Sequence, residues 1–396
     1  MVQSSYLQLP RPHMPITPFA IHITPDALHD LRLRLQSTRW PDEIDQAGWS
    51  YGANLGYMKE LVRHWSHDFS WEKQENRLNS YPQYQTTIDG LKIHFIHAKG
   101  KSPKTIPLLM THGWPSSFTE MLKIIPMLTE PKKFGYDTEY SFDVIVPSLP
   151  GFGFSERPHQ SGCTVPMIAT LWMKLMTEAL GYSRFAAHGS DWGTSITAAL
   201  GFFYPTHVIG IHQTSVTGGT PSHAYPETPP LSQEEAEYLH GREEWWNQHG
   251  AYSHILSTTP QTYGYGLNDS PVGLASLLVE KFRDWSDCNG NVETRFTKDE
   301  MLTNISIYWF TQTITSSMRI YYENQRNPWL ISPQSRVQVP CAIAKFPKEM
   351  SKPCREWGNR FYPIVRWTEF QSGGHFPASE EPALLAQDLL QFFHGI

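Results

Sequence analysis

The sequence has few cysteines and no long apolar run. Its four cysteines, Cys163, Cys288, Cys341 and Cys354, form no Cys-x-x-Cys pair, and this spacing fits neither a disulfide framework nor a zinc site. We therefore expect a reducing, cytoplasmic setting. No stretch approaches the roughly 20 apolar residues that cross a bilayer, and the first residues lack the pattern of a signal peptide. We expect a soluble protein with no membrane anchor.

A strong charge of either sign is also absent. The chain has 32 Lys and Arg residues and 38 Asp and Glu residues, for a formal net charge of −6. This balance gives no reason to expect nucleic acid or an anionic membrane as a partner. With 40% hydrophobic residues the chain is expected to fold rather than to stay disordered. Aromatic residues make up 13% of it, which suits a large core or a pocket for apolar ligands.

Four segments are predicted along the chain. Residues 1–85 contain a Pro-rich start, a capped helix and several tryptophans, and are expected to form a meander packed on a larger domain. In residues 86–217 short apolar strands alternate with helical stretches, which indicates a parallel α/β sheet. Residues 218–335 are mainly helical, and strands return in residues 336–396. The prediction is an α/β core interrupted by a helical insertion.

Individual elements are predicted from apolar runs and from helix caps. The predicted strands are 91–97, 106–110, 142–147, 184–187, 208–212, 339–346 and 364–370. The predicted helices are 27–36, 117–128, 166–180, 194–203 and 382–393.

A candidate nucleophile lies between a predicted strand and a predicted helix. Gly189-Ser190-Asp191-Trp192-Gly193 has the pattern of a nucleophile elbow, with aspartate where serine usually stands. The glycines permit the sharp turn that holds the central residue in a strained conformation. An aspartate that caps the following helix would produce the same pattern, so both interpretations remain open at this point.

Two polar residues after later strands favour the catalytic interpretation. Glu349 follows the strand at 339–346, and His375 follows the last strand. In α/β hydrolases the chain order is nucleophile, acid, histidine. Asp191, Glu349 and His375 are therefore the predicted catalytic set.

The loop that follows the strand at 106–110 reads His112-Gly113-Trp114-Pro115. In this fold that loop supplies one backbone N–H of an oxyanion hole, and the residue after the nucleophile supplies the other. The predicted donors are the amides of Trp114 and Trp192. We expect His112 to shape the turn rather than to act as a base.

An aspartate nucleophile indicates a different reaction from that of a serine. An ionised carboxylate can displace a leaving group at saturated carbon and form an alkyl-enzyme ester. His375, oriented by Glu349, could then activate the water that hydrolyses this ester.

In these motifs the sequence resembles the microsomal-type epoxide hydrolases, over essentially the full chain. The matching blocks are His112 to Pro115, Ser148-Leu149-Pro150-Gly151-Phe152-Gly153-Phe154-Ser155, Gly189 to Gly193, and Gly373-Gly374-His375-Phe376. The resemblance implies an α/β-hydrolase fold with a helical lid, and an epoxide and water as reactants. It implies no metal or organic cofactor, and a homodimer is a common outcome for such enzymes.

The resemblance also implies two lid tyrosines that hold the epoxide oxygen and protonate the alkoxide. Tyr321 matches the later one, with Tyr322 as its neighbour, and Tyr252 is the match for the earlier one. Mammalian members carry a membrane anchor that is not expected here, and Pro377 stands where relatives often have alanine.

Three other functions share parts of this pattern. A haloalkane dehalogenase also uses an aspartate nucleophile and tryptophan N–H groups, but halide leaves without a proton and needs no tyrosine pair. A serine esterase would have to use Ser190 or Ser195, which lie off the centre of the elbow. A non-catalytic receptor on the same fold would not need the water-activating pair. The predicted function is conversion of an apolar epoxide to a vicinal diol.

Overall fold

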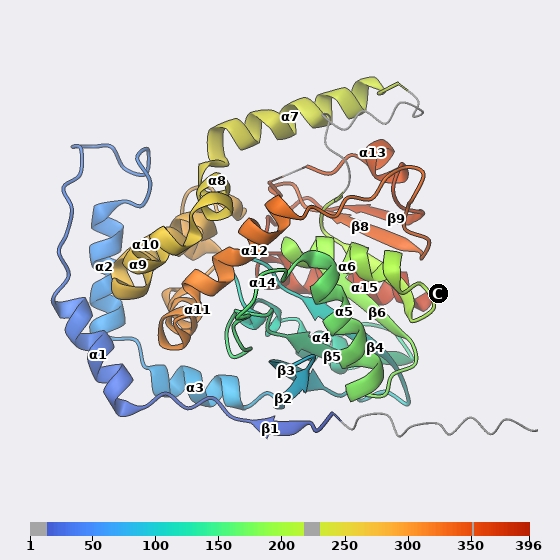
Figure 1. Cartoon of the computed structure of the whole chain (residues 1–396), viewed down its shortest axis with the longest axis horizontal. Coiled ribbons are helices and arrows are strands. Elements are labelled where there is room, and N and C mark those ends of the chain that lie inside the picture. Colours follow the sequence, from blue (N-terminus) through green and yellow to red (C-terminus); the bar gives the residue numbers. More distant parts are fainter. Residues whose placement is uncertain (1–13, 218–229, 351) are drawn as a thin grey trace, which may run out of the picture.

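The computed structural model describes residues 14–217, 230–350 and 352–396. Within them one nine-stranded sheet has the order β1-β2-β3-β5-β4-β6-β7-β8-β9 (Figure 1). The strands are β1 (Thr17–Phe19), β2 (Gln83–Ile88), β3 (Leu91–Ala98), β4 (Lys104–Thr111), β5 (Tyr140–Pro147), β6 (Phe185–Gly189), β7 (Val208–Gln213), β8 (Cys341–Lys345) and β9 (Ile364–Glu369). Strands β4 to β9 pair in parallel, and β1, β2 and β3 pair antiparallel. The mostly parallel α/β sheet that the sequence predicts is confirmed.

The central strands of the sheet, β5 and β6, are buried on both faces along their whole length, because most of their residues are apolar. In β4, Leu108 and Met110 join one hydrophobic cluster and Leu109 joins the other, as the alternation of side chains along a strand requires. The first cluster includes Leu389 of α15 (Pro382–His394), and the second includes Leu200 of α6 (Trp192–Phe203). Helix α5 (Val165–Lys174), which continues into the π-helical turn η3 (Leu175–Ala179), packs beside α6. Covered faces are typical of parallel sheets.

The N-terminal segment contributes strands as well as helices. Helices α1 (Pro25–Gln36), α2 (Leu55–His67) and α3 (Trp71–Asn79) begin at side-chain caps, and α1 and α2 contact α10 (Pro271–Trp285) (Figure 1). Strands β1 and β2 extend the sheet, and β2 spans residue 85. Neither strand is predicted from the sequence, because β1 has three residues and β2 is largely polar.

The predicted helix at 117–128 is wrong as a continuous element. The chain instead forms a 3-10 turn, η1 (Phe118–Met121), and a short helix, α4 (Ile125–Thr129). Pro126 stands in the first turn of α4. Proline has no N–H to donate and would clash inside a longer helix, so the helix restarts there.

A mainly helical segment separates β7 from β8. Its described helices are α7 (Gln233–His249), α8 (Ala251–Thr258), α9 (Pro260–Asp269), α10, η4 (Val292–Thr294), α11 (Lys298–Thr311) and α12 (Ile314–Arg326). Residues 218–229, where the sequence predicts this segment to begin, lie outside the described residues. In Figure 1, α7 crosses above β8 and β9, and α8 to α12 gather beside the sheet. Helix α12 packs on α8 and α9.

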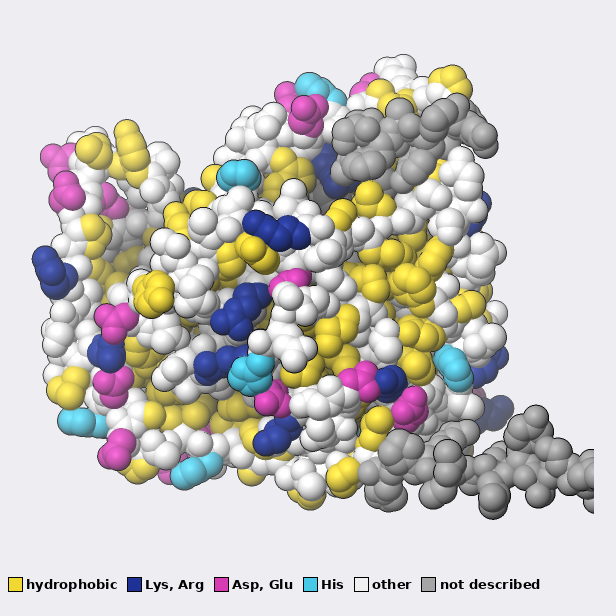
Figure 2. Space-filling view, in the orientation of Figure 1, with side chains coloured by type: hydrophobic (Ala, Val, Ile, Leu, Met, Phe, Trp, Pro, Cys, Tyr) yellow, Lys and Arg dark blue, Asp and Glu magenta, His cyan; other side chains and the backbone are white. Residues whose placement is uncertain are grey.

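Short elements complete the described chain: η2 (Pro131–Phe134), α13 (Arg355–Asn359) and α14 (Pro377–Glu380). Among the described residues we find no helix with the length and apolarity to span a membrane. Acidic and basic side chains are both spread over the face of the molecule in Figure 2, which agrees with the modest net charge of −6.

Candidate active site

Asp191 occupies a sharp turn between β6 and α6. Its backbone φ is 50° and its ψ is −124°, a conformation that L-residues adopt only when their surroundings enforce it. Here close packing of the backbone around the turn imposes this conformation. A Cβ on Gly189 would lie 2.1 Å from the carbonyl oxygen of Gly193, and a Cβ on Gly193 would lie 2.0 Å from that of Thr111. The two glycines are therefore required by the turn itself.

The Asp191 side chain does not cap the helix that follows it. Its Oδ1 instead accepts a hydrogen bond of 2.8 Å from the backbone amide of Trp114. Among the described backbone amides, that of Trp114 is the one that donates to the Asp191 carboxylate. The amide of Trp192, the other predicted donor, lies in the first turn of α6, next to Asp191. The geometry is that of a nucleophile elbow and not of an N-cap.

The loop that carries Trp114 is held by its own short contacts. His112 donates from Nδ1 to the carbonyl of Gly113 at 3.0 Å and accepts at Nε2 from the amide of Leu149 at 3.2 Å. Burial lowers the pKa of His112 to about 4, so the ring is neutral and shapes the turn. A Cβ on Gly113 would lie 2.1 Å from Asp191 Oδ1. Only glycine at that position leaves room for the carboxylate.

His375 and Glu349 meet beside Asp191. His375 Nδ1 lies 2.8 Å from Glu349 Oε1, and His375 Nε2 lies 3.4 Å from Asp191 Oδ2. The side chains of His375 and Glu349 are 2% and 3% exposed, against 16% for Asp191, and of the three it is Asp191 that lines the cavity. Glu349 Oε1 also accepts from the Met350 amide at 2.8 Å. Burial lowers the pKa of His375, but the charges of Glu349 and Asp191 outweigh burial and hold this pKa well above its ordinary value.

The loop that bears His375 is placed by contact with the helical segment. The His375 amide donates to the carbonyl of Trp285, at the end of α10, at 2.9 Å. A Cβ on Gly374 would lie 2.7 Å from that same carbonyl. The rings of Trp285 and His375 meet edge to face at 5.2 Å. Imidazole orientation therefore depends on α10 as well as on Glu349.

Two tyrosines from the helical segment converge above this group. Tyr252 of α8 and Tyr321 of α12 have ring centroids 6.0 Å apart. The Trp114 ring contacts both, at 5.7 Å and 5.8 Å, and Trp192 meets Tyr321 at 5.0 Å. Burial raises the pKa of both phenols, with a further increase from the charge of Asp191. Both are therefore neutral hydrogen-bond donors.

Tyr322, the neighbour of Tyr321, does not share this position. The Arg326 guanidinium lies 3.4 Å over its ring, and Tyr322 is absent from the lining of the cavity that contains Tyr321. Consecutive residues on a helix point about 100° apart, so only one of the two can face Asp191.

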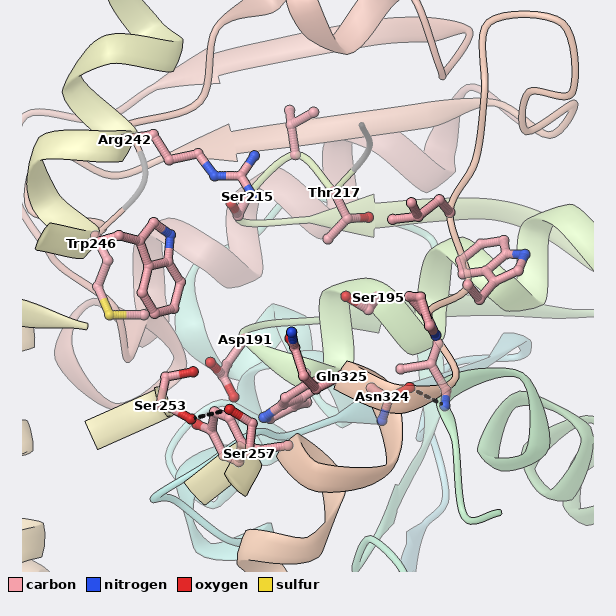
Figure 3. Close-up of a pocket in the computed structure, with 18 of the residues that line it drawn as sticks. Asp191, Ser195, Ser215, Thr217, Arg242, Trp246, Ser253, Ser257, Asn324 and Gln325 are labelled. Atoms are coloured by element: carbon pink, nitrogen blue, oxygen red, sulfur yellow. Dashed lines mark hydrogen bonds between the residues drawn. The ribbon is translucent and has the colours of Figure 1, made fainter. Parts of the chain in front are cut away.

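A cavity of about 440 Å³ opens onto the carboxylate. Figure 3 shows Asp191 with Ser253 and Ser257 of α8, which share a hydrogen bond, and with Asn324 and Gln325 of α12. Much of the wall is aromatic, from Trp192, Trp245, Trp246, Tyr252, Tyr321 and Trp329. Its volume and lining suit a small, mainly apolar ligand.

Three charged residues near the site are not identified from the sequence. Arg242 of α7 lines the cavity, and Lys281 of α10 lies over the Tyr252 ring. Glu120 is buried and accepts hydrogen bonds from Ser190 Oγ, at 3.0 Å, and from Ser116 Oγ; burial raises the pKa of Glu120 to about 7. None of the three belongs to a sequence motif. Among the described residues there is no group of His, Cys, Asp and Glu that could hold a metal.

Comparison with known proteins identifies the class first. Residues 106–256 match a family described as the alpha/beta hydrolase fold, and residues 16–121 match one described as the epoxide hydrolase N terminus. Sheet order and elbow geometry agree, and the chain is an α/β hydrolase.

The similarity to individual proteins shows the family to which the chain belongs. The chain is 42% identical over 386 residues to a putative epoxide hydrolase of Stigmatella aurantiaca, a match that covers 96% of this chain and 85% of that protein. It is 37% identical over 410 residues to epoxide hydrolase 1 of Oryctolagus cuniculus, covering 95% and 88%. The crystal structure of juvenile hormone epoxide hydrolase from the silkworm Bombyx mori superposes with a TM-score of 0.87 at 30% identity, covering 96% and 95%. The chain belongs to the epoxide hydrolase family, and the prediction that it is an enzyme of this kind is confirmed.

Proposed function

We propose that this enzyme converts an apolar epoxide to a vicinal diol through a covalent ester on Asp191. The observation that carries the proposal is the convergence of one carboxylate, one His–Glu pair and two phenols on a single cavity. The Trp114 amide holds Oδ1, so Oδ2 is the oxygen that attacks. The new bond joins Oδ2 to a ring carbon, the ring C–O bond breaks, and its electron pair goes to the epoxide oxygen.

Tyr252 and Tyr321 would hold the epoxide oxygen and supply its proton. An alkoxide is far more basic than a phenolate, so a phenol of raised pKa still gives up its proton once the ring has opened. Before that moment, the raised pKa keeps both hydroxyl protons in place as donors. The helical segment that bears the tyrosines would act as a lid over the sheet edge.

His375 would act in the second half of the reaction. While Asp191 is ionised, the nearby negative charge favours the protonated imidazole. Formation of the ester removes that charge, so the pKa of His375 falls and the ring can accept a proton from water. The resulting hydroxide attacks the ester carbonyl, and the negative charge that develops on Oδ1 is stabilised by the Trp114 amide. Collapse of this intermediate releases the diol and restores the carboxylate.

The test is to trap the ester. His375→Gln, exposed to styrene oxide, should accumulate a covalent adduct on the peptide that contains Asp191, as measured by mass spectrometry. Asp191→Asn should form neither adduct nor diol. A His375→Gln protein with no adduct, or an Asp191→Asn protein that still forms diol at the wild-type rate, would contradict the mechanism.

A panel of haloalkanes tests the alternative function, in which the leaving group is a halide instead of an epoxide oxygen. Halide departs without a proton, so the buried tyrosine pair would have no role in its release. We expect diol formation from epoxides and no halide release. Halide release without any diol would assign the site to dehalogenation.

A further inference from the structure

Arg242 is the positively charged residue of the cavity wall. Among the described lining residues, Asp191 and Arg242 are the two that carry a charge. Asp191 lies at the end of β6 and Arg242 on α7, so the opposite charges come from different layers of the molecule. In Figure 3 the guanidinium extends from α7 toward Ser215 and Thr217, which follow β7. The cavity thus has a nucleophilic end and a cationic end.

Arg242 has no carboxylate within 4.0 Å among the described residues, unlike Arg360, which pairs with Glu235 of the same helix as Arg242. On the same helix, Glu235 is bound bidentately by Arg360, and Glu244 pairs with His240. Neither of these contacts includes Arg242. Burial raises the pKa of Tyr238, which lies one turn earlier on α7, and the positive charge of Arg242 opposes this increase. Because the phenol of Tyr238 is neutral, it does not compensate the positive charge of the Arg242 guanidinium.

Several other polar groups of the wall already have partners. Thr217 Oγ1 lies 2.6 Å from Tyr362 Oη. Asn324 accepts from the Val165 amide at 2.9 Å and donates to the Ile320 carbonyl at 2.8 Å. Ser257 donates to the Ser253 carbonyl. A ligand that needs strong polar recognition at this end would therefore find it in Arg242.

We propose that Arg242 selects epoxides that carry a carboxylate at the end of an apolar chain. This rests on the proposed function. Guanidinium groups bind carboxylates through two parallel hydrogen bonds, and the wall also has apolar contacts for a hydrocarbon chain, from Trp246, Val216 and Ile331. Asp191 repels a substrate carboxylate, so the anion lies at the Arg242 end and the epoxide at the Asp191 end. Arg242 would thus fix the direction in which the substrate enters.

The experiment compares an ω-epoxy fatty acid with its methyl ester, which has the same chain and no charge. The wild-type enzyme should have a kcat/KM about 10- to 100-fold higher for the acid, the size of one charge-assisted interaction. The difference should lie mainly in KM, because the carboxylate is bound equally in ground and transition states. Arg242→Met should abolish the preference and Arg242→Lys should keep part of it. Arg32→Met, which removes an exposed charge of α1 outside the cavity, should leave the preference unchanged.

A binding measurement separates this proposal from the proposed function. The saturated fatty acid of the same length cannot react, and its binding can be followed by quenching of the tryptophans that line the cavity. We expect Arg242→Met to weaken this binding about 10-fold or more. If the fatty acid binds wild type and Arg242→Met equally, or if acid and ester are hydrolysed equally well by wild type, the role of Arg242 is wrong even though diol forms. If neither epoxide is opened but fatty-acid binding still depends on Arg242, the anion site stands and the proposed reaction fails.

Discussion

The ammonium of Lys281 lies 4.6 Å from the centre of the Tyr252 ring. Lys281 is 7% exposed, and its Nζ is 2.7 Å from Glu280 Oε2. The Tyr252 ring is also stacked nearly parallel to the Trp114 ring, at 5.7 Å and 7°. A cation over an aromatic face is attracted by its π electrons, and a phenolate ring carries more negative charge than a phenol ring. Lys281 therefore favours the state in which Tyr252 has given up its proton.

We expect Lys281→Met to slow ring opening about 2- to 30-fold, the range of a single cation–π contact. Single-turnover fluorescence after rapid mixing with an epoxide measures this step. The double variant Glu280→Gln/Lys281→Met, which leaves no unpaired buried charge, should be slowed less than Lys281→Met, because the charge of Glu280 raises the pKa of Tyr252. Lys298→Met is the control, since Lys298 lies 6.0 Å over Tyr57 and outside the cavity. Ring opening at the wild-type rate in both Lys281 variants would show that the cation has no part in it.

Tyr321→Phe should lower kcat on the order of 10²-fold with a smaller effect on KM, because a general acid contributes at least this much and Tyr252 remains. Diol production under steady-state conditions gives both constants. Tyr322→Phe removes the same hydroxyl one residue later, from a ring held under Arg326, and should leave kcat unchanged. Equal losses in the two variants would point to a general effect on α12 rather than to proton donation.

The pH dependence of ester hydrolysis should follow His375. A protonated imidazole cannot accept a proton from water, so hydrolysis is lost as pH falls below the pKa of His375 in the ester. Glu349 raises that pKa. Glu349→Gln should therefore move the acid limb to lower pH, while the plateau rate falls on the order of 10-fold or more because the base is weaker and less well oriented. The decay of the ester, followed after a single turnover across this pH range, is the measurement. An unchanged midpoint would contradict the electrostatic role of Glu349.

Gly113→Ala should abolish most activity without unfolding the protein. The new Cβ would lie 2.1 Å from Asp191 Oδ1, so the carboxylate must leave the Trp114 amide. Loss of one oxyanion donor costs about 10²- to 10³-fold in kcat. Gly241→Ala is the matched control: a Cβ there meets no described atom within 4 Å, and in the interior of α7 it should stabilise the fold by about 0.5–1 kcal/mol. Activity assays and thermal melting of the two variants make the comparison; full activity in Gly113→Ala would show that the contact is dispensable.

The core strands and the turns at the site could be predicted from the sequence because their causes are local. An apolar run bounded by turn residues predicts a buried strand, and glycines two residues to either side of Asp191 predict a turn too tight for a Cβ. Chain order then predicts which polar residues stand at the same sheet edge. For this reason Asp191, Glu349 and His375 could be named together, although up to 184 positions separate them (375 − 191).

Other features were decided only by the tertiary structure, because they depend on contacts between segments that are distant in the sequence. The three-residue strand β1 forms because β2 offers it a partner, and no pattern in three residues can show that. The choice between Tyr321 and Tyr322 depends on how α12 is rotated against the core. The places of Arg242 and Lys281 depend on how α7 and α10 lie over the sheet. The sequence by itself determined the candidate nucleophile and the backbone turn that holds it. Packing between elements decided which charged side chains lie around the cavity, because the sequence of a helix does not specify which neighbour its polar face will contact.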